Sequence, residues 1–354
     1  MRKSRKVLAL VMAGVMGLSL TACGSGQTET TEAETSAESA AETAASSEAE
    51  SGEEIAAEEG AEAAASDTVY QIGVLQLTQH DALDKANEGF FAALDEAGIQ
   101  YEADQQNAAG EQSTCQTVAE KFASDGKDLI FAIATSAAQA VAGVIADTPV
   151  VITAVTDPAD SGLVADNAAP GGNVTGTSDL TPVTEQIQLL KQILPDAQTV
   201  GILYCSAEAN SVLQAEMAKE ACEAEGLEAV EYTVSASNEI QTVVESMVGK
   251  VDAIYAPTDN MIAAGMATVA MVANDNGLPV ICGEGGMVEA GGLATYGIDY
   301  YELGYLAGEQ AVDILVNGAD PAEIPIGYLA AEDCELQVNQ ETADILGIDV
   351  SGLQ

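Results

Sequence analysis

Hydroxyl and amide side chains stand twice between an apolar strand and an Ala-rich helix. In the segment 130–145, "IFAIATSAAQAVAGVI", the turn carries Thr135 and Ser136. In the segment 254–270, "IYAPTDNMIAAGMATVA", the turn is Pro-Thr-Asp-Asn. The start of a helix offers unpaired backbone N–H groups and the positive end of the helix dipole, which favour an anion. Because serine and threonine also cap helices without any ligand, the turns allow two interpretations, a helix cap or a site for a small polar ligand.

Acidic residues follow several predicted strands and offer partners for a cation. Asp157 lies in "AVTDP", Asp259 in "PTDN" and Glu284 in "CGEGG". The carboxyl ends of parallel strands meet at one edge of a sheet, so any of the three can receive an ammonium group, although each is also a common turn or cap residue. The single histidine, His80 in "QLTQHDALD", is either a solvated loop residue or a ligand contact.

The charge balance excludes several kinds of ligand. The chain has 354 residues, 57 of them acidic and 10 basic. Four of the basic residues, Arg2, Lys3, Arg5 and Lys6, lie at the N-terminus, so the rest of the chain has lysines but no arginine. Such an acidic chain repels nucleic acid and anionic membrane surfaces. Without a guanidinium fork, we expect a ligand carboxylate to be bound by backbone N–H groups and hydroxyls.

The sequence lacks the common motifs for catalysis, cofactors and metals. It has no Gly-x-Ser-x-Gly, and no Gly-x-Gly-x-x-Gly or Walker lysine follows a predicted strand. After Cys23 the remaining cysteines are scattered without a Cys-x-x-Cys pair, which matches neither a zinc site nor a disulfide framework. We therefore expect no enzyme, no cofactor and no metal.

The first residues have the pattern of a secretory leader. Residues 1–23, "MRKSRKVLALVMAGVMGLSLTAC", are a basic region, a short apolar run and a lipobox in which Cys23 is lipidated. The alternative is an ordinary signal peptide in which Cys23 is incidental. Residues 24–67 are mostly Gly, Ser, Thr, Ala and Glu, which predicts a disordered acidic tether. We expect an extracytoplasmic protein that is lipid-anchored to the outer face of the cell membrane.

A repeat organises the chain from Tyr70 onward. "YQIGVLQL" predicts a strand, followed by an amphipathic helix that ends at Gly98, and "TVGILY" predicts a strand followed by a helix that ends at Gly226. Gly73 to Gly98 and Gly201 to Gly226 have the same spacing of 25 residues, and two further strand segments match in order. An internal duplication follows. Each half reads β-α-β-α-β-α-β, a parallel sheet with helices on both faces.

The two halves predict two lobes. Lobe one is expected to comprise residues 68–180 and 297–322, and lobe two residues 181–296 and 323–354. Chain segments that pass repeatedly between two lobes make a hinge, and the space between the lobes is where a ligand is enclosed. The predicted fold class is α/β, with two doubly wound parallel sheets, a hinge and an interlobe ligand cleft.

The motifs resemble one bacterial family when taken in order. "IGVLQLTQHDALDKANEGF", "AIATSAAQA", "PVVITAVTDP", "PGGNVTGTSDLTPV", "ILYCSAEANSV", "VDAIYAPTDN" and "GIDYYELG" are similar to the substrate-binding lipoproteins of ABC importers, in the branch typified by tryptophan- and tyrosine-binding members. The resemblance covers nearly all of Tyr70 to Gly347. It implies the type I periplasmic binding protein fold and an aromatic or hydrophobic amino acid as ligand. The implied partners are an ABC permease and its ATPase, and the binding protein itself is expected to be a monomer.

The resemblance also implies ligand-binding residues at the ends of strands in both lobes. They are Gln76, His80, Thr135, Ser136, Thr156 and Asp157 in lobe one, and Asn210, Ser211, Thr258, Asp259 and Asn260 in lobe two. Where relatives have a Ser-Asp-Thr type of loop, this chain reads Cys-Gly-Glu-Gly-Gly, which adds Glu284 to the expected ligand-binding residues.

The expected mechanism is capture by closure. The ligand carboxylate meets the helix start at Thr135 and Ser136, an acidic group receives the ammonium, and the side chain packs against residues such as Phe131, Tyr204 or Tyr300. Three other functions stay open on the sequence. They are a sensor ectodomain, a binding protein for a sugar, nucleoside or peptide, and a secreted hydrolase. The lack of tryptophan weakens the sugar alternative.

Overall fold

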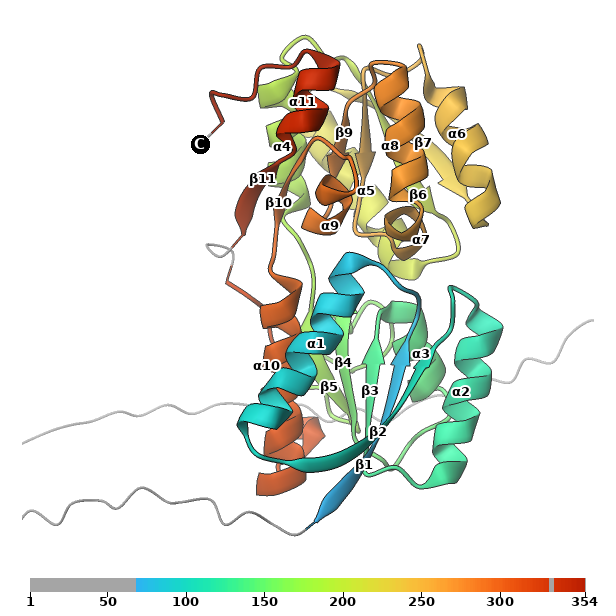
Figure 1. The fold of residues 1–354 in the computed structure, drawn as a ribbon, viewed down its shortest axis with the longest axis vertical. Helices are drawn as coiled ribbons and strands as arrows, with labels where there is room; N and C mark the ends of the chain where they lie inside the picture. The colour runs from blue at the N-terminus through green and yellow to red at the C-terminus, as the bar shows by residue number, and fades with distance from the viewer. Residues whose placement is uncertain (1–67, 331–333, 354) are drawn as a thin grey trace, which may run out of the picture. The chain divides into compact units, whose positions relative to one another are not determined.

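The computed structural model describes residues 68–330 and 334–353. These residues form two sheets, each flanked by helices (Figure 1). We call the part built on strands β1 to β5 lobe one and the part built on strands β6 to β11 lobe two. The predicted leader with Cys23 and the tether 24–67 lie outside the described residues. None of the helices in the described ranges is long and apolar enough to cross a membrane.

Lobe one is built on a five-stranded parallel sheet in the order β2-β1-β3-β4-β5. Its strands are β1 (Val69–Gln76), β2 (Gln100–Asn107), β3 (Leu129–Ile133), β4 (Val150–Val155) and β5 (Val174–Ser178). Its helices α1 (Asp81–Glu96) and α10 (Tyr300–Asn317) cover one face, and α2 (Gln112–Asp125) and α3 (Thr135–Ala142) cover the other (Figure 1). Because helices cover both faces, β3 and β4 are buried along their whole length and read as continuous apolar runs.

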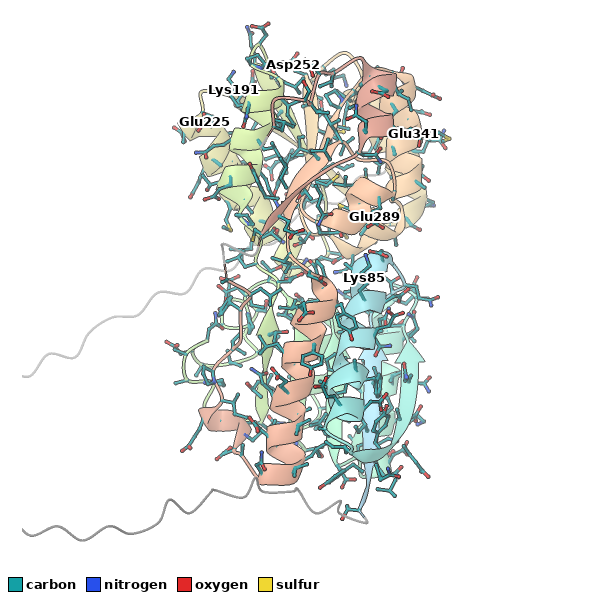
Figure 2. The ribbon with its side chains drawn as sticks, turned by 60° about the vertical axis from the view of Figure 1, so that its left-hand side comes forward. Lys85, Lys191, Glu225, Asp252, Glu289 and Glu341 are labelled. Carbon is teal, nitrogen blue, oxygen red and sulfur yellow. The ribbon has the colours of Figure 1, made fainter. Side chains whose placement is uncertain are left out.

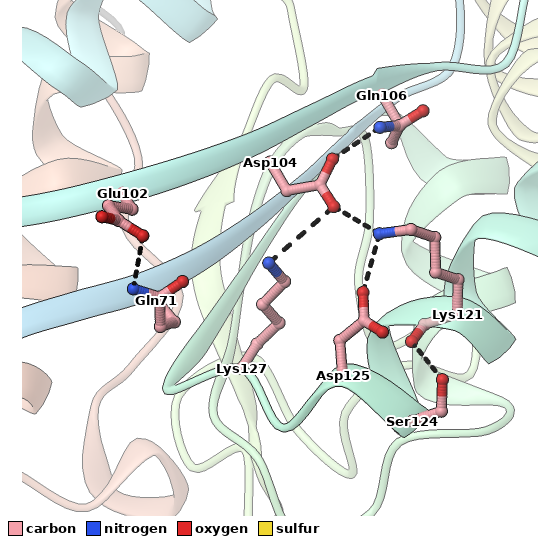
Figure 3. Close-up of polar contacts among 8 residues, drawn as sticks. All are labelled: Gln71, Glu102, Asp104, Gln106, Lys121, Ser124, Asp125 and Lys127. Atoms are coloured by element: carbon pink, nitrogen blue, oxygen red, sulfur yellow. Dashed lines mark hydrogen bonds and ion pairs between the residues drawn. The ribbon is translucent and has the colours of Figure 1, made fainter.

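Strand β2 forms the outer edge of this sheet and carries charged side chains. Asp104 on β2 contacts Lys121 and Lys127, and Lys121 also pairs with Asp125 at 2.7 Å (Figure 3). Charged groups on an edge strand oppose pairing with the strand of another chain. These charged residues therefore protect the exposed edge of the sheet from pairing with the strand of another chain.

Helices α1 and α10 approach each other closely because glycines lie at their contact. A Cβ atom on Gly304 would lie 1.9 Å from the carbonyl oxygen of Ala86, and one on Gly89 would lie 2.0 Å from that of Tyr301. Neither position has room for a side chain. This contact holds the helix that follows the first strand against the helix that returns from lobe two.

Lobe two is built on a six-stranded sheet in the order β11-β10-β9-β8-β6-β7. Its strands are β6 (Thr199–Cys205), β7 (Glu228–Val234), β8 (Ala253–Ala256), β9 (Val280–Cys282), β10 (Ala294–Gly297) and β11 (Glu335–Val338). Its helices are α4 (Val183–Ile193), α5 (Ala209–Ala224), α6 (Ile240–Met247), α7 (Asn260–Ala264), α8 (Met266–Asp275), α9 (Gly285–Glu289) and α11 (Gln340–Leu346). Strand β11, which comes after the repeat, runs antiparallel to β10, whereas the other neighbouring strands of this sheet run parallel.

The two lobes repeat one topology. The order β2-β1-β3-β4-β5 in lobe one corresponds to β7-β6-β8-β9-β10 in lobe two. Gly73 and Gly201 lie at the same point of the first strand in each lobe, where a Cβ would meet Ile130 at 2.9 Å or Met247 at 2.4 Å. Gly98 and Gly226 follow the first helix with φ of 70° and 71°. The inferred duplication is confirmed, although each half has a fifth strand, β5 or β10, beyond the four predicted.

The chain passes between the lobes near residues 180, 298 and 330. The predicted third crossing at residue 323 comes too early. Residues 324–327 stay with lobe one, where Ile326 N donates to Asn167 O at 2.8 Å and Ser178 N donates to Gly327 O at 2.9 Å. Backbone pairing to the end of β5 therefore carries lobe one past the predicted boundary.

Candidate functional site

A narrow cavity lies where the carboxyl ends of both sheets meet. Its volume is about 10 Å³, close to the space that one water molecule needs, so the lining side chains are packed closely in this arrangement. Its lining residues come from both lobes and are His80, Leu83, Ala154, Asp179, Asn210, Thr258, Asp259, Asn260, Ala263, Glu284 and Tyr300. The interlobe ligand cleft expected from the topology is therefore present, in a closed arrangement.

Hydrogen bonds between side chains of the two lobes hold this arrangement. His80 Nε2 lies 3.2 Å from Asn260 Oδ1, and Gln214 Nε2 donates to Thr156 Oγ1 at 3.2 Å. At the edge of the cleft Lys85 on α1 faces Glu289 on α9, 3.7 Å apart (Figure 2). The two hydrogen bonds involve buried or partly buried groups, whereas the ion pair is exposed to solvent and contributes little.

Lobe one presents a strained strand edge and an uncapped helix. Ala134 and Ala154, at the carboxyl ends of β3 and β4, have φ of 83° and 54°, a region that alanine rarely adopts. Strain of this kind gathers at functional sites. Helix α3 starts directly after Ala134 and has no side-chain cap, while the buried Thr135 Oγ1 has no hydrogen-bond partner. The capping interpretation of Thr135 is thus not supported.

In lobe two the corresponding turn is capped. Asp259 Oδ1 accepts from Ile262 N at 2.8 Å and its Oδ2 accepts from Cys205 N at 2.6 Å. Glu208 accepts from Asn260 Nδ2 at 2.6 Å and from Met261 N at 3.1 Å. Both carboxylates thereby fix the short helix α7 and the side chain of Asn260. The two similar turns of the sequence have different roles.

Asp179 is a site residue that sequence reasoning did not select. It is 5% exposed and lines the cavity from the segment that leaves β5. Tyr300 OH donates to it at 2.9 Å and Thr156 Oγ1 donates at 3.1 Å. Burial raises the pKa of this carboxyl, and the two hydroxyl donors oppose that rise. The Gly- and Thr-rich β5 was not recognised as a strand, so the acid at its carboxyl end was missed.

The cavity holds buried acidic groups, and no lysine or arginine is among its lining residues. Burial raises the pKa of Glu284 to about 7, and raises that of Asp259 and Asp179 as well. Next to the cavity, burial raises the pKa of Glu208 to about 8. Carboxylates taken out of water need a cation or a hydrogen-bond donor. The site is therefore suited to a ligand that brings a positive charge, and no group of metal-ligating residues is found in the described parts of the chain.

The structure brings six of the twelve predicted residues to the cavity lining. They are His80, Asn210, Thr258, Asp259, Asn260 and Glu284. Ser136 lines an adjoining recess that shares Asn260 with the cavity. Gln76, Thr135, Thr156 and Ser211 are buried. Asp157 lies apart, because it accepts bonds from Ala159 N, Asp160 N and Asn167 Nδ2 in a turn.

Two of the aromatic residues expected at the site lie elsewhere. Phe131 stacks on Phe90 in the core of lobe one, with ring centroids 3.7 Å apart. Tyr204 OH donates to Glu231 at 2.6 Å on the outer strand pair of lobe two. Tyr300 lines the cavity as expected.

Two similar α/β lobes that enclose a polar cavity define a type I periplasmic binding protein. Residues 71–352 match the ABC transporter substrate binding protein family, and the chain belongs to that family. It is accordingly a substrate-binding protein of an ABC transporter, and such proteins are extracytoplasmic.

Several relatives are similar over most of their length. The chain is 38% identical over 351 residues to the tyrosine-binding protein of Clostridioides difficile (strain R20291), covering 98% of this chain and 93% of that protein. It is 39% identical to an ABC domain from Streptococcus pneumonia solved with L-Trp, covering 80% of this chain and 96% of that one, with a TM-score of 0.77.

A third relative differs in its conformation. A ligand-free, open substrate-binding protein with adhesive properties from Clostridium difficile is 42% identical, covering 80% of this chain and 97% of that one, yet its TM-score is 0.62. The chain thus superposes better on the L-Trp complex than on the open protein, despite the lower identity. This agrees with the closed arrangement of its lobes.

Proposed function

We propose that this protein binds an aromatic L-amino acid, tyrosine or tryptophan, and delivers it to an ABC permease and its ATPase. The observation that carries the proposal is the set of buried carboxylates that line the cavity beside apolar side chains, with no lysine or arginine among the lining residues. Similarity to a protein named for tyrosine and to a structure solved with L-Trp supports the same ligand class.

The ligand ammonium pairs with Asp179 in this proposal. Both oxygens of Asp259 already accept backbone N–H groups, and Glu284 likewise accepts from Gly286 N and Met287 N. Among the side chains of other residues, only the hydroxyls of Thr156 and Tyr300 donate to Asp179. Hydroxyl groups can rotate, so they can make room for a stronger donor. An ammonium there would offset the cost of burying the carboxylate.

The ligand carboxylate meets the start of helix α3. The first N–H groups of that helix have no side-chain cap, and Thr135 Oγ1 is buried without a partner. No arginine occurs after residue 5 of the chain, so backbone N–H groups and hydroxyls are the donors available for a carboxylate. The aromatic side chain packs against Leu83, Ala263 and the ring of Tyr300.

Membrane attachment and assembly complete the proposal. Lipidation at Cys23 anchors the chain to the outer face of the membrane, residues 24–67 act as a tether, and the binding protein works as a monomer without catalytic turnover. The lipobox pattern and the acidic composition support the first two points. Cys23→Ala would release the protein into the medium, and a variant that stayed in the membrane fraction would contradict the anchor.

Ligand analogues that lack one charged group test the proposed pose. Calorimetry with L-tyrosine, with tyramine, which lacks the carboxylate, and with hydroxyphenylpropionate, which lacks the ammonium, separates the two ends. Each analogue should bind at least about tenfold more weakly than tyrosine, because a charged hydrogen bond is worth roughly 1.5–3 kcal/mol. Equal binding of tyrosine and hydroxyphenylpropionate would contradict the role of the acidic groups.

A further inference from the structure

His80 occupies an unusual position for the only histidine of the chain. It immediately precedes helix α1, lines the cavity, and its ring Nδ1 is buried without a hydrogen-bond partner. A buried polar atom without a partner costs free energy. A donor from the ligand would remove that cost.

The partners of Asn260 fix which nitrogen of His80 carries the proton. Asn260 Nδ2 donates to Glu208 Oε2 at 2.6 Å, and Glu208 also accepts from the backbone N–H of Asn260 and Met261. The amide of Asn260 is thereby oriented with Oδ1 toward His80 Nε2, 3.2 Å away. Since Oδ1 can only accept, Nε2 must donate, and in the neutral imidazole Nδ1 is then an acceptor.

The ring of His80 is favoured in its neutral form. Burial lowers its pKa, and this effect outweighs the hydrogen bond to Asn260 and the charges of Asp84 and Asp81, which raise it. Glu208 and Asp259 lie beyond Asn260, while Asp179, Glu284 and Tyr300 line other parts of the cavity. The acceptor assignment itself follows from the hydrogen-bond geometry.

The apolar part of the cavity lies next to the same pair. Leu83 comes three positions after His80, and Ala263 comes three positions after Asn260 on α7, and all four residues line the cavity. Asp179, by contrast, leaves the end of β5 and is bonded to Tyr300. The ammonium and the aromatic ring of an amino acid therefore have separate partners, a carboxylate for the charge and a neutral acceptor beside apolar side chains for the ring.

We propose that His80 Nδ1 is the specificity-determining acceptor for a neutral donor on the ligand ring, the phenol O–H of tyrosine or the indole N–H of tryptophan. This inference rests on the proposed function. The donor-bearing rings are bound in preference to phenylalanine, which would leave Nδ1 buried and unpaired. A site built to bond a ligand donor discriminates strongly against an analogue that lacks it. Because Asn260 belongs to lobe two, its bond to Nε2 makes His80 Nδ1 an acceptor only when the lobes are closed.

Pairs of ligands with the same shape test the proposal. The affinities of the stripped full-length mature protein are measured for L-tyrosine against L-phenylalanine, and for L-tryptophan against benzothienyl-L-alanine, in which sulfur replaces the indole N–H. At least one donor-bearing ligand should bind roughly 10- to 100-fold more tightly than its partner. Equal affinities within both pairs would overturn the proposal and leave aromatic amino-acid binding intact. No binding by any of the four would overturn the proposed function, and this inference with it.

Two variants of His80 separate the acceptor from the contact between lobes. His80→Gln keeps a donor near the position of Nε2 but has no acceptor at Nδ1, whereas His80→Asn keeps an amide oxygen near Nδ1 but does not reach Asn260. The ratio of the two affinities in each pair should fall toward one in His80→Gln and persist in His80→Asn. A ratio unchanged in His80→Gln, with both ligands weakened equally, would assign Nδ1 to the ligand ammonium and overturn the proposal.

Discussion

His80 and Asn260 lie 180 positions apart in the chain, and their side chains meet across the two lobes at 3.2 Å between Nε2 and Oδ1. His80 follows the first strand of lobe one, and Asn260 follows β8 of lobe two. The pair thus joins the carboxyl edges of the two sheets. Such a bond exists only while the lobes are closed, so it links ligand capture to conformation.

Asn260→Ala should shorten the lifetime of the complex. The change removes the bond to His80 and the restraint that Glu208 places on it. A lost hydrogen bond of this kind costs about 1–2 kcal/mol, or roughly 5- to 30-fold in affinity, and most of the loss should appear in the dissociation rate. Stopped-flow fluorescence of ligand release measures it.

Lys85→Ala is the matched control for that experiment. The side chains of Lys85 and Glu289 are 42% and 65% exposed, and exposed ion pairs contribute about 0–1 kcal/mol. Dissociation should change by less than about fivefold. A larger effect from Lys85→Ala than from Asn260→Ala would mean that the ion pair, and not the buried hydrogen bond, holds the lobes together.

Asp179→Asn should weaken binding by about 1.5–3 kcal/mol, or more than about tenfold, because it removes the charge proposed for the ligand ammonium while keeping the size of the side chain. Asp157→Asn is the control, since Asp157 is bonded within its own turn, and the affinity should stay within about twofold. Calorimetry measures both. An unchanged affinity in Asp179→Asn would remove this residue from the site.

Gly304→Ala should destabilise the protein. Its Cβ would lie 1.9 Å from the backbone oxygen of Ala86, so α10 must move away from α1, at a cost of about 1–3 kcal/mol or more. Gly172 has an ordinary φ and nothing within 4 Å of a Cβ, so Gly172→Ala should be neutral or slightly stabilising. Denaturant unfolding gives both free energies of unfolding. Equal values for the two variants would contradict the tight α1–α10 contact.

The ligand-free protein should open as the pH rises. Glu284 lines the interlobe cavity, where burial and, to a smaller extent, the charge of Asp81 on lobe one raise its pKa to about 7 from an ordinary value of 4.5. Closing therefore takes up a proton between those values, so the closed form is favoured at low pH and loses that contribution as the pH rises through about 7.

Small-angle scattering measures this opening. The radius of gyration of the stripped protein should increase between about pH 6 and about pH 9, and the increase should be smaller in Glu284→Gln, which does not titrate. Bound ligand should keep the protein closed at both values. A radius that is independent of pH in the ligand-free protein would contradict the account.

The lobes could be predicted from sequence because their signals are local and repeated. The equal spacing from Gly73 to Gly98 and from Gly201 to Gly226 marks two copies of one strand and helix, and continuous apolar runs mark the buried strands. Strand β5, "VTGTS", has no such run. Its threonines are paired through tertiary contacts, such as Thr177 Oγ1 with Thr153 Oγ1 at 2.9 Å, which sequence periodicity does not reveal.

From the sequence one could predict which loops form the site, but not what each side chain in those loops binds. The positions of His80, Asp259 and Glu284 after strands placed them at the cleft. What each carboxylate binds depends on neighbours distant in sequence. Cys205 N donates to one oxygen of Asp259, which is 54 positions away in the chain. Tyr300 OH donates to Asp179, which is 121 positions away. For that reason the ammonium partner proposed from the structure, Asp179, is none of the three acids that the sequence offered, Asp157, Asp259 and Glu284.

Calorimetric titration of the refolded, ligand-stripped protein with the twenty amino acids shows directly whether the protein binds an aromatic amino acid. Tyrosine or tryptophan should bind with a Kd in the micromolar range or below, about −8 kcal/mol or stronger, and acidic and basic amino acids should not bind. Failure of both aromatic amino acids to bind, or tighter binding of an aliphatic one, would contradict the proposed function.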